Sequence, residues 1–165
     1  MRLDLHEIIN IPGGMVSFDY QPNVSELDFP SVTGFTEPLR AAGTVRNTAG
    51  VLKLKAVITA KLRCNCARCL REFEMDLKLD TEAVLVTEAQ DRDDPDLYFL
   101  DGDCVDVDEV VVTAFVLNLD QRILCSEDCK GLCEKCGKNL NDGPCSCRAE
   151  SDPRFAVLGQ LLENE

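Results

Sequence analysis

The sequence predicts an α+β protein dominated by an antiparallel β-sheet that can curl into a barrel, with one main helix and a C-terminal cysteine-rich appendage. Three observations predict it: apolar and polar residues alternate over successive segments, one later segment has helical spacing, and the ten cysteines fall mostly in close pairs. A length of 165 residues suits one domain with a small appendage. We expect a sheet domain over 1–124, the appendage over 125–147 and a tail over 148–165.

Period-two alternation indicates half-buried strands that pair as an antiparallel meander with one core face. The expected strands are 15–20, 39–46, 51–63 and 71–80. In the third of them, apolar side chains share one face and the opposite face is largely basic. Residues 47–50 and the cysteine segment 64–70 are the expected turns, whereas 21–38 contain three prolines and no sustained period.

Helical patterns follow in the second half of the chain. An acidic loop over 88–104 precedes a helix over about 107–119, which Asp106 can cap at its N-terminus. A short final helix is expected over 153–162, with Pro153 at its first position.

The ten cysteines favour metal ligation over disulfides. An even number also fits a disulfide-rich secreted protein, but the acidic N-terminus lacks the apolar core of a signal peptide. No apolar run approaches the ~20 residues of a membrane span. We therefore expect a cytoplasmic protein without membrane contact, whose reducing surroundings keep the thiols available for metal.

The C-terminal cysteines carry the strongest motif of the chain. Cys133 and Cys136, followed by Gly137, form a zinc-knuckle pattern in which two thiolates bracket one metal. Cys145 and Cys147 can complete the tetrahedron after an eight-residue turn. Four thiolates leave no open coordination position, so the sequence predicts a structural zinc appendage.

A second zinc is a further hypothesis, so we expect one or two ions. Cys125 and Cys129 can lie on one face of a helical turn, and Cys66 and Cys69 lie between the two clearest strands. One zinc held by all four would tie the appendage to the sheet. Alternatively, Cys125 or Cys129 joins the C-terminal site, and the upstream pair stays free.

Enzymatic functions find little support in the sequence. His6 is the only histidine, and no phosphate-binding glycine loop occurs. Thiol redox chemistry is a third possibility, but it needs a CxxC at a helix N-terminus, whereas Cys66 and Cys69 join antiparallel strands. We expect no enzymatic activity and no small-molecule substrate.

Several segments together resemble one protein family. Cys66-Ala67-Arg68-Cys69 resembles the CxRC turn of the YceD family, the large ribosomal RNA subunit accumulation proteins. The segment 125–147 is similar to the cysteine-rich tail of its Gram-positive-type members, and 152–158 is similar to the family's closing segment. The resemblance implies a non-enzymatic bacterial factor that supports the accumulation or processing of large-subunit (23S) rRNA. It assigns no binding residues.

Charge leaves the mode of contact with rRNA open. The net charge is −13, and residues 88–109 hold ten acids and one base, so RNA phosphates repel the chain as a whole. A local basic face is the candidate for direct RNA contact. Its residues are Lys53, Lys55, Lys61, Arg63 and Arg68. The alternative is a zinc-dependent protein-interaction module, whose acidic segment 88–109 escorts a basic ribosomal protein.

Overall fold

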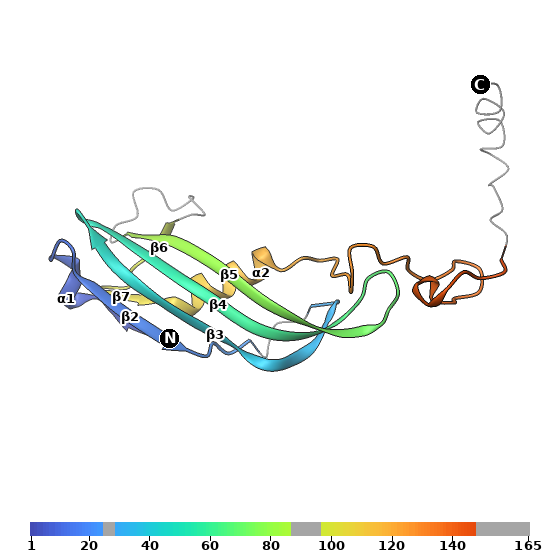
Figure 1. Cartoon of the computed structure of the whole chain (residues 1–165). Coiled ribbons are helices and arrows are strands. Elements are labelled where there is room, and N and C mark those ends of the chain that lie inside the picture. The colour runs from blue at the N-terminus through green and yellow to red at the C-terminus, as the bar shows by residue number, and fades with distance from the viewer. Residues whose placement is uncertain (25–28, 87–96, 148–165) are drawn as a thin grey trace, which may run out of the picture.

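A computed structural model describes residues 1–24, 29–86 and 97–147 of the chain. It contains a five-stranded sheet in the order β2-β3-β4-β5-β6 and a two-stranded sheet of β1 and β7 (Figure 1). The elements in chain order are β1 (Arg2–Asp4), α1 (His6–Ile9), β2 (Met15–Tyr20), β3 (Val32–Thr48), β4 (Val51–Asn65), β5 (Glu72–Val86), β6 (Leu97–Phe99), β7 (Cys104–Asp106), α2 (Val107–Asn118) and the short 3-10 helix η1 (Leu140–Asp142). The described chain is mostly sheet with few helices, as the α+β prediction expects.

The central meander follows the predicted alternation. On β4, the even-numbered residues from Leu52 to Cys64 are buried, whereas Lys55, Val57 and Thr59 between them are exposed to solvent. β3 and β4 are joined by the two-residue turn Ala49-Gly50, in which both residues have positive φ. Such turns match the right-handed twist of the strands, so the chain reverses tightly and keeps the apolar residues on one face.

Two features of the predicted sheet are wrong. The sheet stays open, with β2 and β6 at its two borders, rather than closing into a barrel. It is also mixed, because the three-residue β6 runs parallel to β5. β6 pairs only with Val84–Val86 at the end of β5. The two border strands, β2 and β6, therefore cannot pair along their length, as a closed barrel requires.

The irregular stretches also differ from expectation. β3 begins at Val32, within the segment expected to lack a period, and its first half carries register shifts against β4. The shifts hide the alternation that would have marked this half as a strand. β6 likewise lies inside the expected acidic loop over 88–104, of which 88–96 fall outside the described residues.

Helix α2 covers the concave face of the sheet. Asp106 caps it as predicted, with its carboxylate accepting a hydrogen bond from the Asp108 amide at 3.1 Å. The helix buries Val110, Val111 and Phe115, and the Phe115 ring contacts those of two aromatic residues before and within β3. Burying a side chain of this size contributes about 1.5–3 kcal/mol, so α2 closes the core.

The expected helix over 153–162 and the expected tail over 148–165 lie outside the described residues. Among the residues that the structure does describe, no helix is long and apolar enough to cross a membrane.

Candidate metal centres

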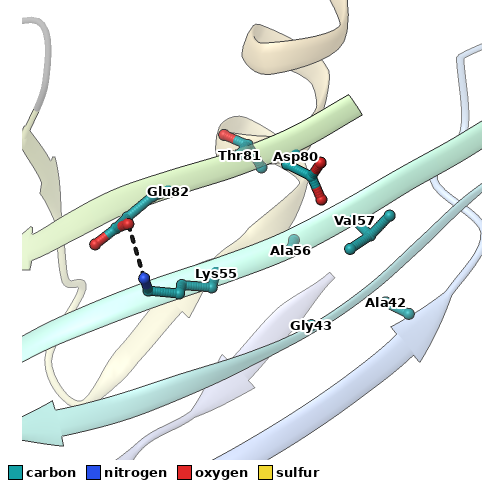
Figure 2. Close-up of a pocket in the computed structure, with 8 residues that line it drawn as sticks. All are labelled: Ala42, Gly43, Lys55, Ala56, Val57, Asp80, Thr81 and Glu82. Carbon is teal, nitrogen blue, oxygen red and sulfur yellow. Dashed lines mark ion pairs between the residues drawn. The ribbon is translucent and has the colours of Figure 1, made fainter. Parts of the chain in front are cut away.

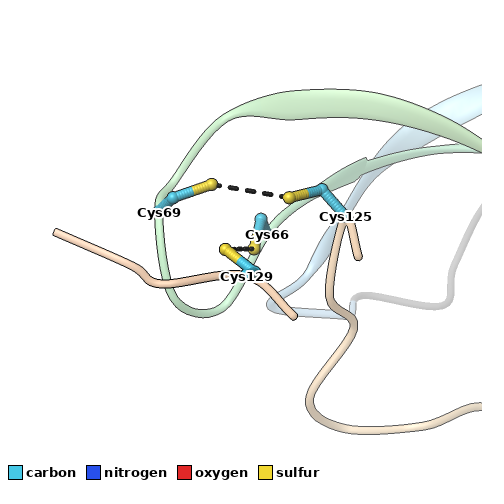
Figure 3. A group of neighbouring side chains, drawn as sticks. All are labelled: Cys66, Cys69, Cys125 and Cys129. Atoms are coloured by element: carbon cyan, nitrogen blue, oxygen red, sulfur yellow. Dashed lines mark hydrogen bonds between the residues drawn. The ribbon is translucent and has the colours of Figure 1, made fainter. Parts of the chain in front are cut away.

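An inner cysteine cluster forms where the β4–β5 loop meets the chain that follows α2 (Figure 3). The Leu70 amide donates to the Cys66 carbonyl at 2.9 Å, and Leu70 adopts a positive φ of 57° to close this turn. The Ala67 amide donates to the Ile123 carbonyl at 2.8 Å. These bonds hold the loop against the later segment, which brings Cys125 and its neighbours to the loop.

The four sulfur atoms of the inner cluster lie at metal-ligand spacing. Those of Cys66, Cys69, Cys125 and Cys129 are all within 4.8 Å of one another. The Sγ–Sγ distances are 3.7 Å for Cys66–Cys129 and 3.7 Å for Cys69–Cys125. A tetrahedron with arms of about 2.3 Å has edges of about 3.8 Å, whereas a disulfide needs about 2.05 Å. The inner cluster therefore fits one tetrahedral thiolate-bound ion.

The outer cluster is local and more exposed. Cys133, Cys136, Cys145 and Cys147 also have sulfur atoms within 4.8 Å of one another, and Cys136 is exposed to solvent. The Gly137 amide donates to the Cys133 carbonyl at 2.8 Å, and Gly137 has a φ of 71°, which favours glycine. The knuckle pattern thus forms a turn that gathers four ligands without help from the sheet.

Each cluster holds thiols whose pKa values are pushed apart. Burial opposes ionisation of Cys66, but neighbouring backbone N–H groups lower its pKa to about 6. Backbone N–H groups that follow Cys133 lower its pKa to about 6 as well. Burial and the adjacent thiols raise the pKa of Cys125 to about 12, and hydrogen bonding by Cys136, with burial, raises that of Cys147 to about 12. Closely spaced thiolates repel one another, so a divalent cation is what allows all four to ionise.

The ten cysteines fall into two clusters of four and two residues that belong to neither. All ten are free, eight of them belong to the two clusters, and each cluster can hold a metal ion. Cys64 is buried in the core and Cys104 lies on β7, and neither belongs to a cluster. The structure thus brings the sequence-predicted ligands together in two sets of four, with neither Cys125 nor Cys129 in the outer set.

Asn141 connects the two clusters, a contact that was not predicted from the sequence. Its side-chain amide donates to the Cys129 sulfur at 3.3 Å, and its carbonyl oxygen accepts from the Lys130 amide at 2.8 Å. The hydrogen bond also lowers the pKa of Cys129. Asn141 lies on η1, inside the turn that separates the two halves of the outer ligand set. The Asn139-x-Asn141 pattern, with its capping hydrogen bonds, is the signal that could have drawn attention to it.

Two arginines fix the appendage to the β4–β5 loop. Arg68 donates to the Cys129 carbonyl at 2.9 Å and to the Glu127 carbonyl at 3.4 Å. Arg71 forms an ion pair of 2.9 Å with Asp142. Arg68 therefore has structural partners in the appendage, and its role as an RNA contact stays a prediction.

The basic face of β4 is countered by acids from β5. Glu82 pairs with Lys53 at 3.5 Å and with Lys55 at 2.9 Å. Lys61 pairs with Glu74 at 3.5 Å. Arg63 lies 4.0 Å from the Glu72 carboxylate. All the lysines and arginines that we predicted on this strand thus have an acidic neighbour.

A shallow depression of about 540 Å³ lies in the same outer face (Figure 2). Ala42, Gly43 and Ala56 are among the residues that line it, and the Lys55–Glu82 ion pair lies at its side. A Cβ atom on Gly43 would lie 2.3 Å from the Lys55 carbonyl oxygen, so the close approach of β3 and β4 requires glycine. The depression is a consequence of this strand packing.

Comparisons with known proteins identify one family. The sequence profile described as "Large ribosomal RNA subunit accumulation protein YceD" matches residues 54–162, which include both clusters. The chain is 37% identical over 60 residues to "Large ribosomal RNA subunit accumulation protein YCED homolog 1, chloroplastic" of Arabidopsis thaliana, covering 36% of this chain and 19% of the relative.

Mycobacterial relatives are similar over a longer stretch. An uncharacterized protein of Mycobacterium tuberculosis is 27% identical over 120 residues, covering 70% of this chain and 58% of its own. Another, of Mycobacterium leprae, is 23% identical over 130 residues, covering 76% and 59%. The chain thus spans less than two thirds of the length of these relatives. No solved structure matches it. With two thirds of its residues matched by the family profile, the chain belongs to the YceD family.

Proposed function

We propose that this protein is a non-enzymatic ribosome biogenesis factor that supports the accumulation of large-subunit (23S) rRNA in the bacterial cytoplasm. The family match over residues 54–162 is the observation that carries the proposal. Two structural zinc ions hold the appendage, one in each cysteine cluster. Four thiolates per ion leave no position for substrate, which supports a structural rather than a catalytic metal.

Contact with the assembling subunit is made through a basic ribosomal protein. The chain carries a net charge of −13, and two zinc ions with eight thiolates bring this to about −17. Such a charge repels RNA at long range. The basic face of β4 does not offset this, because Glu72, Glu74 and Glu82 neutralise much of it.

Crosslinking in cells, with RNA and protein partners sorted, tests this function. Depletion of the protein should lower 23S rRNA relative to 16S rRNA. The wild-type chain should crosslink mainly to a ribosomal protein. Neutralising Asp93, Asp94 and Asp96, acids outside the described residues, should weaken that crosslink.

The matched control reverses the opposite charge. Changing Lys53, Lys55 and Lys61 to Glu should leave the protein crosslink in place, because these side chains face away from the core. Strong RNA crosslinks at these lysines without any ribosomal protein would contradict protein-mediated contact. Unchanged 23S rRNA after depletion would contradict the function itself.

Direct RNA contact at one end of the sheet is a second candidate. Arg46 is the register partner of Lys53, and it forms no ion pair with any residue that the structure describes. Glu82 alone counters both Lys53 and Lys55 there. This end therefore keeps excess positive charge. If it binds RNA, Arg46→Glu should weaken binding of a 23S fragment, most strongly at low salt.

A further inference from the structure

We propose that the open edge of β5 binds an extended segment of a partner protein, in which basic and apolar residues alternate, as an added strand. This inference rests on the proposed function, since it supplies the surface through which a basic ribosomal protein would be held. The proposed recognition depends on backbone hydrogen bonds, apolar contacts and charge pairs, so a synthetic peptide can test it in the absence of any ribosome.

The edge of β5 is long, and no described strand lies on its outer side. β4 pairs with β5 from Glu72 to Leu85, whereas β6 pairs with Val84–Val86 only. Residues 73–83 therefore have one described neighbouring strand, and Figure 1 shows β5 along the border of the sheet. Eleven residues at about 3.3 Å each span roughly 36 Å, which leaves room for a partner strand of eight to ten residues, at about the same rise per residue. Unpaired amide and carbonyl groups on such an edge are a template for another strand.

The core-facing side chains of this edge are incompletely covered. Met75 and Leu79 are half-buried, although their register partners on β4, Leu62 and Ile58, are completely buried. The same half-burial extends to Phe73 and Leu77. An apolar side chain on an added strand would cover this row, which is the usual source of specificity in strand addition.

The opposite face of the edge carries a row of acids. Its charged residues are Glu72, Glu74, Asp76, Lys78, Asp80 and Glu82. Asp76 and Asp80 form no ion pair with any described residue, so they are available to a partner. An added strand with lysine or arginine at alternate positions would place its charges opposite this row, and opposite-charge pairs across strands are stabilising.

The same charges select against a second copy of the chain. If two β5 edges paired with each other, their acidic rows would lie on facing strands. Like charges directly opposite each other in a sheet are destabilising. Charged edges also protect sheets from self-association. The row thus disfavours self-pairing and favours a basic partner strand.

Hydrogen exchange on the zinc-loaded full chain tests the proposal. The probe is a capped ten-residue peptide of alternating lysine and valine. Two control peptides carry glutamate in place of lysine, or the same lysines and valines in two blocks. We expect the alternating basic peptide to slow exchange of the amides within residues 73–83 that point away from β4, and the control peptides to leave it unchanged.

Charge-reversal variants locate the interaction. Asp76→Lys together with Asp80→Lys should weaken binding of the alternating peptide by about tenfold or more, since two cross-strand charge pairs are lost and two repulsions gained. The matched control reverses Glu7 and Asp120, two exposed acids away from this edge, and should bind as wild type. If the lysine variant does not fold, Asp76→Asn with Asp80→Asn should still weaken binding, by a smaller factor.

Three results would overturn the inference. The first is slow exchange, in the free protein, of those amides of 73–83 that do not donate to β4. The second is equal protection by the alternating peptide and the block peptide, and the third is an equal loss of binding in the control variant. Failure of the ribosomal role gives a different pattern, in which the peptide binds the edge but no ribosomal protein crosslinks in cells. A ribosomal protein crosslinked only elsewhere, with no peptide binding at the edge, defeats this inference and leaves the proposed function intact.

Discussion

The inner and outer clusters each contain four cysteine ligands, but the two sets are assembled in different ways. In the inner cluster, Cys66 and Cys129 are 63 positions apart and their sulfur atoms are 3.7 Å apart. The outer cluster gathers its four sulfurs from the short segment between Cys133 and Cys147. Three inner cysteines are buried, whereas none of the outer ones is.

This difference separates a metal centre that depends on the fold from one that depends on local spacing. The outer ligands can meet around an ion in an otherwise unfolded chain. The inner ligands meet only after the β4–β5 loop and the segment following α2 have come together. A metal ion bound at the inner cluster would therefore stabilise the whole fold, while one bound at the outer cluster would stabilise its own turn.

The largest expected effect distinguishes the clusters by stability. Cys69→Ser should remove one metal ion and lower the free energy of unfolding of the sheet by on the order of 4 kcal/mol, or roughly 10 °C in melting temperature. The matched variant Cys136→Ser should also remove one ion but lower the melting temperature of the sheet much less. Circular dichroism melts with metal analysis check both. Equal melting losses for the two variants would mean that the clusters do not differ as described.

Acid should release the metal ions from both clusters and show which cluster loses its ion first. The pKa values of Cys66 and Cys133 are lowered to about 6, so these thiolates are retained above that pH and lost as the pH falls through it. Their stabilising contribution is complete only above the ordinary thiol pKa of about 8.5, and declines toward pH 6. Metal release, followed with a chromogenic chelator, should rise as pH drops from 8 to 5. The exposed outer cluster should lose its ion first, and a single uniform phase would argue against the distinction.

Asn141 should transmit an effect from one cluster to the other. Removing its hydrogen bond to the Cys129 sulfur with Asn141→Ala should weaken metal binding at the inner cluster by about 10-fold, a typical result for an outer-shell partner of a metal ligand. The control is Asn118→Ala, whose amide donates to the Ala114 carbonyl within α2. Competition with a chelator of known affinity measures both variants. Wild-type affinity in Asn141→Ala would show that the clusters are independent.

The smallest effect is expected at the surface ion pair between the appendage and the loop. Arg71 and Asp142 are both more than half exposed, and such pairs contribute about 0–1 kcal/mol. Arg71→Ala should shift the melting temperature only slightly and leave the metal content unchanged. Loss of a metal ion in this variant would give the pair a larger role than its exposure allows.

The same contrast explains how much could be predicted from the sequence. The alternation over 51–63 predicted β4, and the spacing from Cys133 to Cys147 predicted the outer cluster, because both patterns are local. The ligand pairing of the inner cluster stayed open, since no local pattern specifies which distant loop meets Cys125 and Cys129. The parallel pairing of β6 and the sulfur contact of Asn141 were missed for the same reason.

Native mass spectrometry of the chain, purified under reducing conditions without added metal, tests directly whether each cluster holds an ion. We predict two zinc ions per chain and ten free thiols after their removal. It also predicts one ion, held at the outer cluster, when Cys66 is changed to Ser. A chain that carries no metal, keeps its fold in excess chelator and contains disulfides would contradict the account.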